Sequence, residues 1–191
     1  MRTLGILLAA GASRRFGAQD KLLADWEGAP LVVAAARALE AAGCDALLAL
    51  VSSDAVEAVL PAPFRAIRAA PGLPLSHTWR AARDHAQQLQ AERALFMLGD
   101  MPSVSAGTIR TLMADDGGSR ACVFDGIPMP PALLTADDMR GLRAEEGDQG
   151  ARALLRSLPR NSLVPLMAEE ALDIDTPKDL CRDRVPPVVR P

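Results

Sequence analysis

The sequence predicts an α/β protein, with an open three-layer α/β/α fold around a mainly parallel sheet. Short apolar runs, typical of strands buried on both faces, alternate along the chain with longer amphipathic segments, typical of helices. The chain has 191 residues, of which 49% are hydrophobic, enough for one domain with a substantial core. Because a helix separates each strand from the next, the strands are expected to run mainly parallel.

The elements follow from these patterns in chain order. The predicted strands span residues 3–10, 46–51, 64–69, 94–98 and 121–124. The predicted helices span residues 30–42, 54–60, 76–92 and 105–114. Gly43 is expected to end the first helix and Pro61 the second. Residues 116–118 are expected to form a turn, and residues 125–160 are less regular and could form a substrate-binding flap.

Composition limits the partners and the compartment. We expect a single domain over residues 1–181 and a flexible, proline- and arginine-rich tail over residues 182–191. The formal net charge of −3 gives no electrostatic reason to expect a nucleic acid or a membrane as partner. No apolar run approaches the roughly 20 residues of a membrane helix. The cysteines form no C-x-x-C pair and no zinc spacing, which fits a reducing compartment, so a cytoplasmic protein is expected. They are Cys44, Cys122 and Cys181.

A glycine-containing loop follows the first predicted strand directly, at residues 9–17. Ligands of open parallel sheets gather beyond the carboxyl ends of the strands, and small residues there let backbone N–H groups approach phosphate oxygens. Ser13 adds a hydroxyl donor, Arg15 a bidentate cation and Lys21 a point charge. The spacing matches neither a P-loop nor a dinucleotide fingerprint, so a tight turn with solvated arginines is an equally good interpretation.

The run LLAAGASRRFGAQDKLLADWEGAPLV, at residues 7–32, resembles the opening of the molybdenum-cofactor nucleotidyltransferase family. That family has L-A-[AG]-G-x-S-x-R-[MF]-G, then Lys, L-L and G-x-P-L. The resemblance implies a Rossmann-like nucleotidyltransferase fold and a loop that wraps a nucleoside triphosphate. The residues implied to bind the nucleotide are Ala9, Ala10, Gly11, Ala12, Ser13, Arg15 and Lys21. An Ala at Ala10, where guanylyltransferases tend to have Gly, favours CTP over GTP.

An acidic residue, Asp100, follows the strand predicted at residues 94–98. A carboxylate at this edge of the sheet can hold Mg²⁺, which prefers oxygen ligands and bridges phosphates. On its own, a residue that accepts hydrogen bonds from nearby backbone N–H groups is the better interpretation, because turns are rich in Asp. The string Asp100-Met101-Pro102 also resembles the family's D-[MQ]-P motif, whose Asp is the main metal ligand.

A second acidic element lies late in the chain, in the string Leu172-Asp-Ile-Asp-Thr-Pro-Lys-Asp-Leu180. Thr176 is predicted as a helix N-cap and Asp179 as its capping-box partner. Asp173 and Asp175 flank Ile174, so on an extended chain they point the same way. The string resembles the family's late motif, whose acidic residue faces the same metal. We predict Asp175, with Asp100, as the metal ligands.

The acceptor side of the site matches the family less well. Ser76 lies in an element that resembles the family's G-x-x-x-S, which contacts base and ribose, although Ser76 is also a plausible N-cap. Pro74 stands where the family usually has a second Ser. Pro130 stands where the family often has His. Residues 147–152 resemble the family's G-D-x-G-A-R at the acceptor pocket and are equally well read as a capped turn.

The resemblance implies Mg²⁺-dependent transfer of a nucleoside monophosphate, with CTP favoured, to a phosphorylated small-molecule acceptor such as molybdopterin. Pyrophosphate is released, and Arg15, Lys21 and Asp100 carry the catalytic roles. Two alternatives stay open. The acceptor could be a sugar phosphate or a methylerythritol phosphate. The protein could instead be a non-catalytic nucleotide-binding factor that partners a molybdoenzyme or its maturation machinery.

Overall fold

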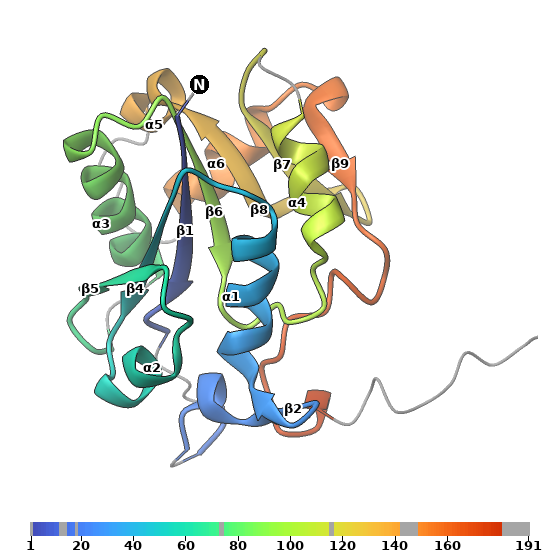
Figure 1. Ribbon diagram of the computed structural model, residues 1–191. Coiled ribbons are helices and arrows are strands. Elements are labelled where there is room, and N and C mark those ends of the chain that lie inside the picture. The colour runs from blue at the N-terminus through green and yellow to red at the C-terminus, as the bar shows by residue number, and fades with distance from the viewer. Residues whose placement is uncertain are drawn as a thin grey trace, which may run out of the picture.

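The computed structural model describes residues 2–11, 15–17, 19–72, 75–114, 117–141 and 149–180. Within these residues, a seven-stranded sheet has the strand order β5-β4-β1-β6-β8-β7-β9, and helices cover both of its faces (Figure 1). The predicted α/β class and the three-layer arrangement are therefore confirmed. Among the described residues, no helix is both long and apolar enough to cross a membrane.

The strands of the main sheet are β1 (Thr3–Ala9), β4 (Ala46–Val51), β5 (Phe64–Arg68), β6 (Arg93–Leu98), β7 (Arg120–Phe124), β8 (Ile127–Thr135) and β9 (Leu163–Pro165). A small hairpin pairs β2 (Asp25–Trp26) with β3 (Ala29–Pro30). The helices are α1 (Leu31–Ala41), α2 (Asp54–Val59), α3 (Leu75–Gln88), α4 (Ala106–Met113), α5 (Ala136–Gly141) and α6 (Gln149–Ser157). The chain also forms the 3-10 turns η1 (Lys21–Leu23) and η2 (Arg160–Ser162).

The apolar run of β1 is continuous because the strand is buried on both faces. Leu7 and Ala9 pack in one core cluster with residues of α1, α2 and α4. Leu4, Ile6 and Leu8 pack in the other with residues of α3, α5 and α6. Alternate side chains of one strand thus anchor the two helical layers, which holds the carboxyl end of β1 rigidly in place.

The carboxyl ends of the central strands meet at one edge of the sheet. β1 pairs in parallel with both β4 and β6. β8 runs antiparallel to β6 and β7, so these two strands share a direction, and β9 is parallel to β7. The predicted glycine loop after β1 and Asp100 after β6 therefore leave the sheet side by side, at the edge where ligands bind in such folds.

The predicted irregular flap at residues 125–160 is wrong for its first part, which forms the long strand β8. Asp125 and Gly126, with φ of 48° and 74°, make a two-residue hairpin turn, and the Asp-Gly pair is the sequence signal that indicates it. The sequence did not predict this strand because proline, which lacks a backbone N–H, is disfavoured within sheets. Pro130 and Pro131 fall where the pairing of β8 with β7 shifts register, so the missing N–H groups break no ladder bond.

The other predicted elements agree with the structure to within a few residues. The largest difference is α3, which ends at Gln88 instead of residue 92. Gln90 adopts a positive φ of 51°, which ends the helix and turns Ala91 into the core. The turn at residues 116–118 is described only in part. The tail at residues 182–191 lies outside the described residues, so the domain boundary stays a prediction.

A glycine in the middle of β1 gives a direct test of the packing. A Cβ on Gly5 would lie 2.7 Å from Leu47 Cδ2 and 3.0 Å from Cys44 Sγ. We expect Gly5→Ala to lower the free energy of unfolding by about 1–3 kcal/mol through overpacking. Gly107→Ala is the control, because its Cβ would be 3.5 Å from the nearest side chain and Ala favours the helix. Urea denaturation of both variants measures the difference, and equal stabilities would contradict the packing of β1.

Candidate active site

Three aspartates from two distant parts of the chain come together at the carboxyl edge of the sheet. Asp100 lies in the turn after β6, and Asp173 and Asp175 lie in the segment that follows β9. Their carboxylate oxygens lie within 4.8 Å of one another. Like charges at this separation repel unless a cation lies among them. The cluster therefore requires positive charge.

The backbone brings the late segment to the end of β6. The N–H of Ile174 donates to the carbonyl oxygen of Asp100 at 3.0 Å. The side chain of Ile174 is fully buried in a small cluster with Phe16, Trp26 and Leu31. Because neighbouring side chains of an extended segment point to opposite sides, burial of Ile174 leaves its two acidic neighbours facing Asp100.

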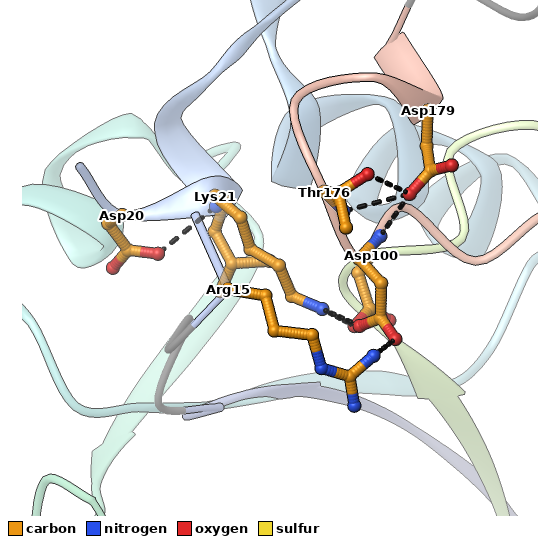
Figure 2. Close-up of polar contacts among 8 residues, drawn as sticks. Arg15, Asp20, Lys21, Asp100, Thr176 and Asp179 are labelled. Carbon is orange, nitrogen blue, oxygen red and sulfur yellow. Dashed lines mark hydrogen bonds and ion pairs between the residues drawn. The ribbon is translucent and has the colours of Figure 1, made fainter. Parts of the chain in front are cut away.

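Two cations from the chain reach the carboxylates. Lys21 lies in η1, whose N-cap Asp20 accepts a hydrogen bond from the Leu22 N–H at 3.1 Å. The Lys21 Nζ lies 2.5 Å from Asp100 Oδ2 and 3.2 Å from Asp175 Oδ1. The Arg15 guanidinium pairs with the other oxygen of Asp175, as Figure 2 shows for the arginine and lysine side chains converging on the carboxylates. Lys21 is buried, whereas the side chain of Arg15 is 70% exposed.

The charges shift the protonation of the cluster. Burial alone would lower the pKa of Lys21, but the carboxylates of Asp100, Asp173 and Asp175 outweigh it and raise the pKa above its usual value. Asp173 is exposed as a residue, yet its carboxyl group lies against protein atoms. Desolvation and the neighbouring Asp100 charge raise the pKa of Asp173 to about 7. Lys21 is therefore protonated at neutral pH. Asp173 is the carboxyl group whose negative charge the surrounding protein stabilises least.

The donor set suits a divalent metal ion. Asp100 Oδ1 is buried, and with Asp173 ionised it accepts no hydrogen bond from the described residues. Carboxylate oxygens are the ligands that Mg²⁺ and Mn²⁺ prefer. Lys21 and Arg15 balance two of the three carboxylates, and Asp173, whose pKa is about 7, adds negative charge to the cluster as it ionises, which favours binding of a further cation.

Other predicted site residues lie at the same edge. Ala9 ends β1, Ala10 is buried just beyond it, and Gly11 is exposed. Ala12 and Ser13 fall outside the described residues. Ser76 is in the first turn of α3, but its side chain is likewise outside the description.

Lys21 contacts the carboxylates of Asp100 and Asp175, and its predicted contact with phosphates stays a prediction. Asp173 was not predicted as a ligand, although its alternation with Ile174 and Asp175 was visible in the sequence. It lies within the same carboxylate cluster as Asp175.

The predicted cap after the cluster is present. Asp179 Oδ2 accepts hydrogen bonds from the N–H and the hydroxyl of Thr176, both at 2.8 Å, which is the capping-box contact (Figure 2). The same oxygen accepts from the Asp175 N–H at 3.3 Å. Residues 176–178 form a bend and a turn, residues 179–180 are in 3-10 conformation, and the residues beyond 180 lie outside the described part of the chain. The cap therefore fixes the backbone of Asp175 from its carboxyl side.

With this geometry in view, the family is clear from comparison with known proteins. The model of the MobA-like NTP transferase domain matches residues 5–162. The chain belongs to that family. As a MobA-like NTP transferase, it is a nucleotidyltransferase. The matched segment contains Arg15, Lys21 and Asp100 and ends before Asp173 and Asp175.

Solved structures share the MobA-like fold. A nucleotidyl transferase from Methanothermobacter thermautotrophicus is similar with a TM-score of 0.79 at 21% identity, over 95% of each chain. The manganese complex of Rv0371c from Mycobacterium tuberculosis H37Rv is similar with a TM-score of 0.77 at 23% identity, over 97% of this chain and 100% of that one. Among curated proteins, nicotine blue oxidoreductase of Paenarthrobacter nicotinovorans is 28% identical over 202 residues, 93% of this chain and 94% of its own.

The raised pKa of Asp173 makes stability depend on pH when no metal is present. Because the folded state holds this proton more tightly than the unfolded state, stability is lost as pH rises from about 4 toward and past about 7. We expect Asp173→Asn, measured in EDTA, to have a higher melting temperature than the wild type at pH 8. The gap should narrow at pH 5.

Asp137→Asn is the matched control for this comparison. Asp137 is an exposed carboxylate on α5 that pairs with Arg140. The difference in melting temperature between Asp137→Asn and the wild type should be the same at pH 5 and pH 8. If the difference in melting temperature between Asp173→Asn and the wild type is the same at both pH values, the raised pKa of Asp173 is contradicted.

Proposed function

We propose that the protein transfers a nucleoside monophosphate from CTP, in preference to GTP, to a phosphorylated small-molecule acceptor such as molybdopterin, with Mg²⁺ as cofactor. The observation that carries the proposal is the carboxylate cluster, with its buried Asp100 Oδ1, at the edge where β1 and β6 end. Family membership supports the use of a nucleoside triphosphate.

In the proposed reaction, a phosphate oxygen of the acceptor attacks the α-phosphorus of the triphosphate. The bond from that phosphorus to the bridging oxygen breaks, and pyrophosphate leaves with the bond's electron pair. A phosphate anion needs no general base, so the chain's task is to position the groups and to stabilise charge. Asp100 and Asp175, with Asp173 as a further oxygen donor, would hold a divalent cation that neutralises phosphate charge.

The cationic side chains have separate proposed tasks. Arg15 is exposed and can turn from Asp175 to the β- and γ-phosphates, where a guanidinium binds bidentately. Lys21 is buried against Asp100, where it would offset part of the carboxylate charge and contact the phosphates of the nucleotide. The backbone of residues 10–13 and the hydroxyl of Ser76 would orient the nucleotide. Ala10 supports CTP through the family resemblance.

The acceptor has a second candidate. Pro130 occupies the position where related sequences often have His, and it is half-buried in β8 at the shift in register. This difference favours an acceptor other than molybdopterin, namely a sugar phosphate or a methylerythritol phosphate. A non-catalytic role as a nucleotide-binding factor for a molybdoenzyme is the remaining alternative, and a cytoplasmic location suits each of them.

The name of the Paenarthrobacter relative raises redox chemistry as a further alternative. The thiols of Cys44 and Cys122 are poorly suited to it, because burial raises their pKa values to about 11 and about 12. Electron transfer would therefore have to draw on a bound cofactor. Consumption of NADH or NADPH with a quinone acceptor can be followed alongside nucleotide turnover.

A panel of acceptors and nucleotides tests the proposal. Full-length protein with Mg²⁺ is incubated with CTP or GTP and with molybdopterin, a sugar phosphate or methylerythritol phosphate, and pyrophosphate release is measured. We expect release with CTP and molybdopterin. Asp100→Asn should lower the rate by about 100-fold or more, because it removes charge stabilisation at the reacting phosphate. The exposed Asp137→Asn should retain the wild-type rate.

The outcomes separate the candidates. Turnover with CTP and only a sugar phosphate or methylerythritol phosphate selects the second acceptor. Nucleotide binding without pyrophosphate release from any acceptor rejects the enzymatic proposal in favour of the accessory role. Release that Asp100→Asn leaves intact would show that the carboxylate cluster is not the reacting site.

A further inference from the structure

Glu170 lies in the chain between β9 and the aspartates Asp173 and Asp175. Its carboxylate joins the segment after β9 to the start of α4. Its Oε1 accepts hydrogen bonds from the Ser105 N–H at 3.0 Å and from the Thr108 hydroxyl at 2.6 Å. Its Oε2 accepts from the Met167 N–H at 3.5 Å. Ser105 is the N-cap of α4, so Glu170 binds the first turn of that helix. The contact links the segment after β9 to the start of α4.

The two linked segments run in opposite directions beside each other. One, residues 100–105, leads from Asp100 to Ser105, and the other, residues 170–174, leads from Glu170 to Ile174. They are joined at one end by the Ile174 N–H bond to the Asp100 carbonyl and at the other by Glu170 on Ser105. Four residues span at most about 14 Å of extended chain, so two fixed ends leave Asp173 little freedom.

The link is a charged one. Partial burial would raise the pKa of Glu170, but the hydrogen bonds from Thr108, Ser105 and Met167 outweigh it and hold the pKa below its usual value. The group is therefore an ionised acceptor at neutral pH, and charge-assisted hydrogen bonds are stronger than neutral ones. The α4 N-terminus adds favourable interaction with a negative charge. Glu170 touches none of the three aspartates in the contacts described.

We propose that Glu170 is a positioning residue for the carboxylate cluster: it fastens residues 166–175 to the first turn of α4 and so sets where Asp173 and Asp175 stand relative to Asp100. The segment is also attached at its start, since the Leu166 N–H donates to the carbonyl oxygen of Val123 at 3.0 Å. Without Glu170, the chain between Leu166 and Ile174 would lose its polar attachment to α4 and keep only the packing of Ala171 and Leu172. The proposal rests on the metal-dependent function proposed above for these aspartates.

Two measurements on the full-length protein test it. Amide hydrogen exchange of Ile174 reports the attachment of the segment whether or not metal binds. Isothermal titration with Mn²⁺ reports the affinity of the cluster. We expect Glu170→Ala to speed exchange at Ile174 and to weaken Mn²⁺ binding by about tenfold, the lower end of the effect of losing a group that orients metal ligands.

Matched variants separate positioning from loss of stability. Glu170→Gln keeps a carbonyl oxygen for Ser105 and Thr108, so it should recover most of the Mn²⁺ affinity. Glu169→Ala removes the neighbouring exposed carboxylate and should change neither measurement. Gly5→Ala destabilises the core far from this segment and should leave Mn²⁺ affinity unchanged. Faster exchange together with weaker Mn²⁺ binding in Glu170→Ala alone supports the proposal.

Two results would overturn it. One is Glu170→Ala with wild-type exchange at Ile174. The other is faster exchange with unchanged Mn²⁺ affinity, which would make Glu170 structural only. If the wild type binds no Mn²⁺, the metal part of the proposed function fails and the role toward a metal site falls with it. The exchange result then still decides whether Glu170 fastens the segment.

Discussion

One backbone hydrogen bond, from the Ile174 N–H to the Asp100 carbonyl, holds the two halves of the site together. Strand β6 delivers Asp100 to the edge of the sheet, and the segment after β9 must cross to the same place. Burial of the Ile174 side chain with Phe16 and Trp26 makes the crossing favourable, because it removes a large aliphatic group from water. The same cluster contains residues of the loop after β1 and of the β2–β3 hairpin, so this loop and the acidic segment share one apolar support.

Charge is the second constraint, and it limits what the cluster can contain. Three carboxylates this close would be strongly unfavourable alone, and a buried ammonium without partners would cost several kcal/mol. Lys21 and the aspartates offset each other's desolvation. The negative charge that Asp173 adds when it ionises, together with the buried Asp100 Oδ1, favours the binding of a cation. The electrostatics of the cluster therefore favour a bound cation, and family membership independently makes the protein a nucleotidyltransferase.

Local patterns predicted the fold well, because buried strands and amphipathic helices leave periodic signals. The exception was β8, where three prolines contradict strand propensity. The register shift accounts for Pro130 and Pro131, whereas Pro128 is paired with Val123. The capping contact of Asp179 was also predictable, since its partner is three residues away. The contacts of Lys21 and Glu170 were not. Their partners lie 79 and 65 residues away in the chain, and no spacing rule reaches across the topology that joins them.

The central claim is that the aspartates from β6 and from the late segment hold one cation between them. Crystals of the full-length protein grown with Mn²⁺ and a nucleoside triphosphate, measured near the manganese absorption edge, test it directly through the anomalous difference map. We expect one strong peak at about 2.0–2.3 Å from Asp100 Oδ1 and from a carboxylate oxygen of Asp173 or Asp175. A manganese ion ligated by phosphate oxygens and by none of the three aspartates, with Lys21 still paired to Asp100 and Asp175, would contradict the account.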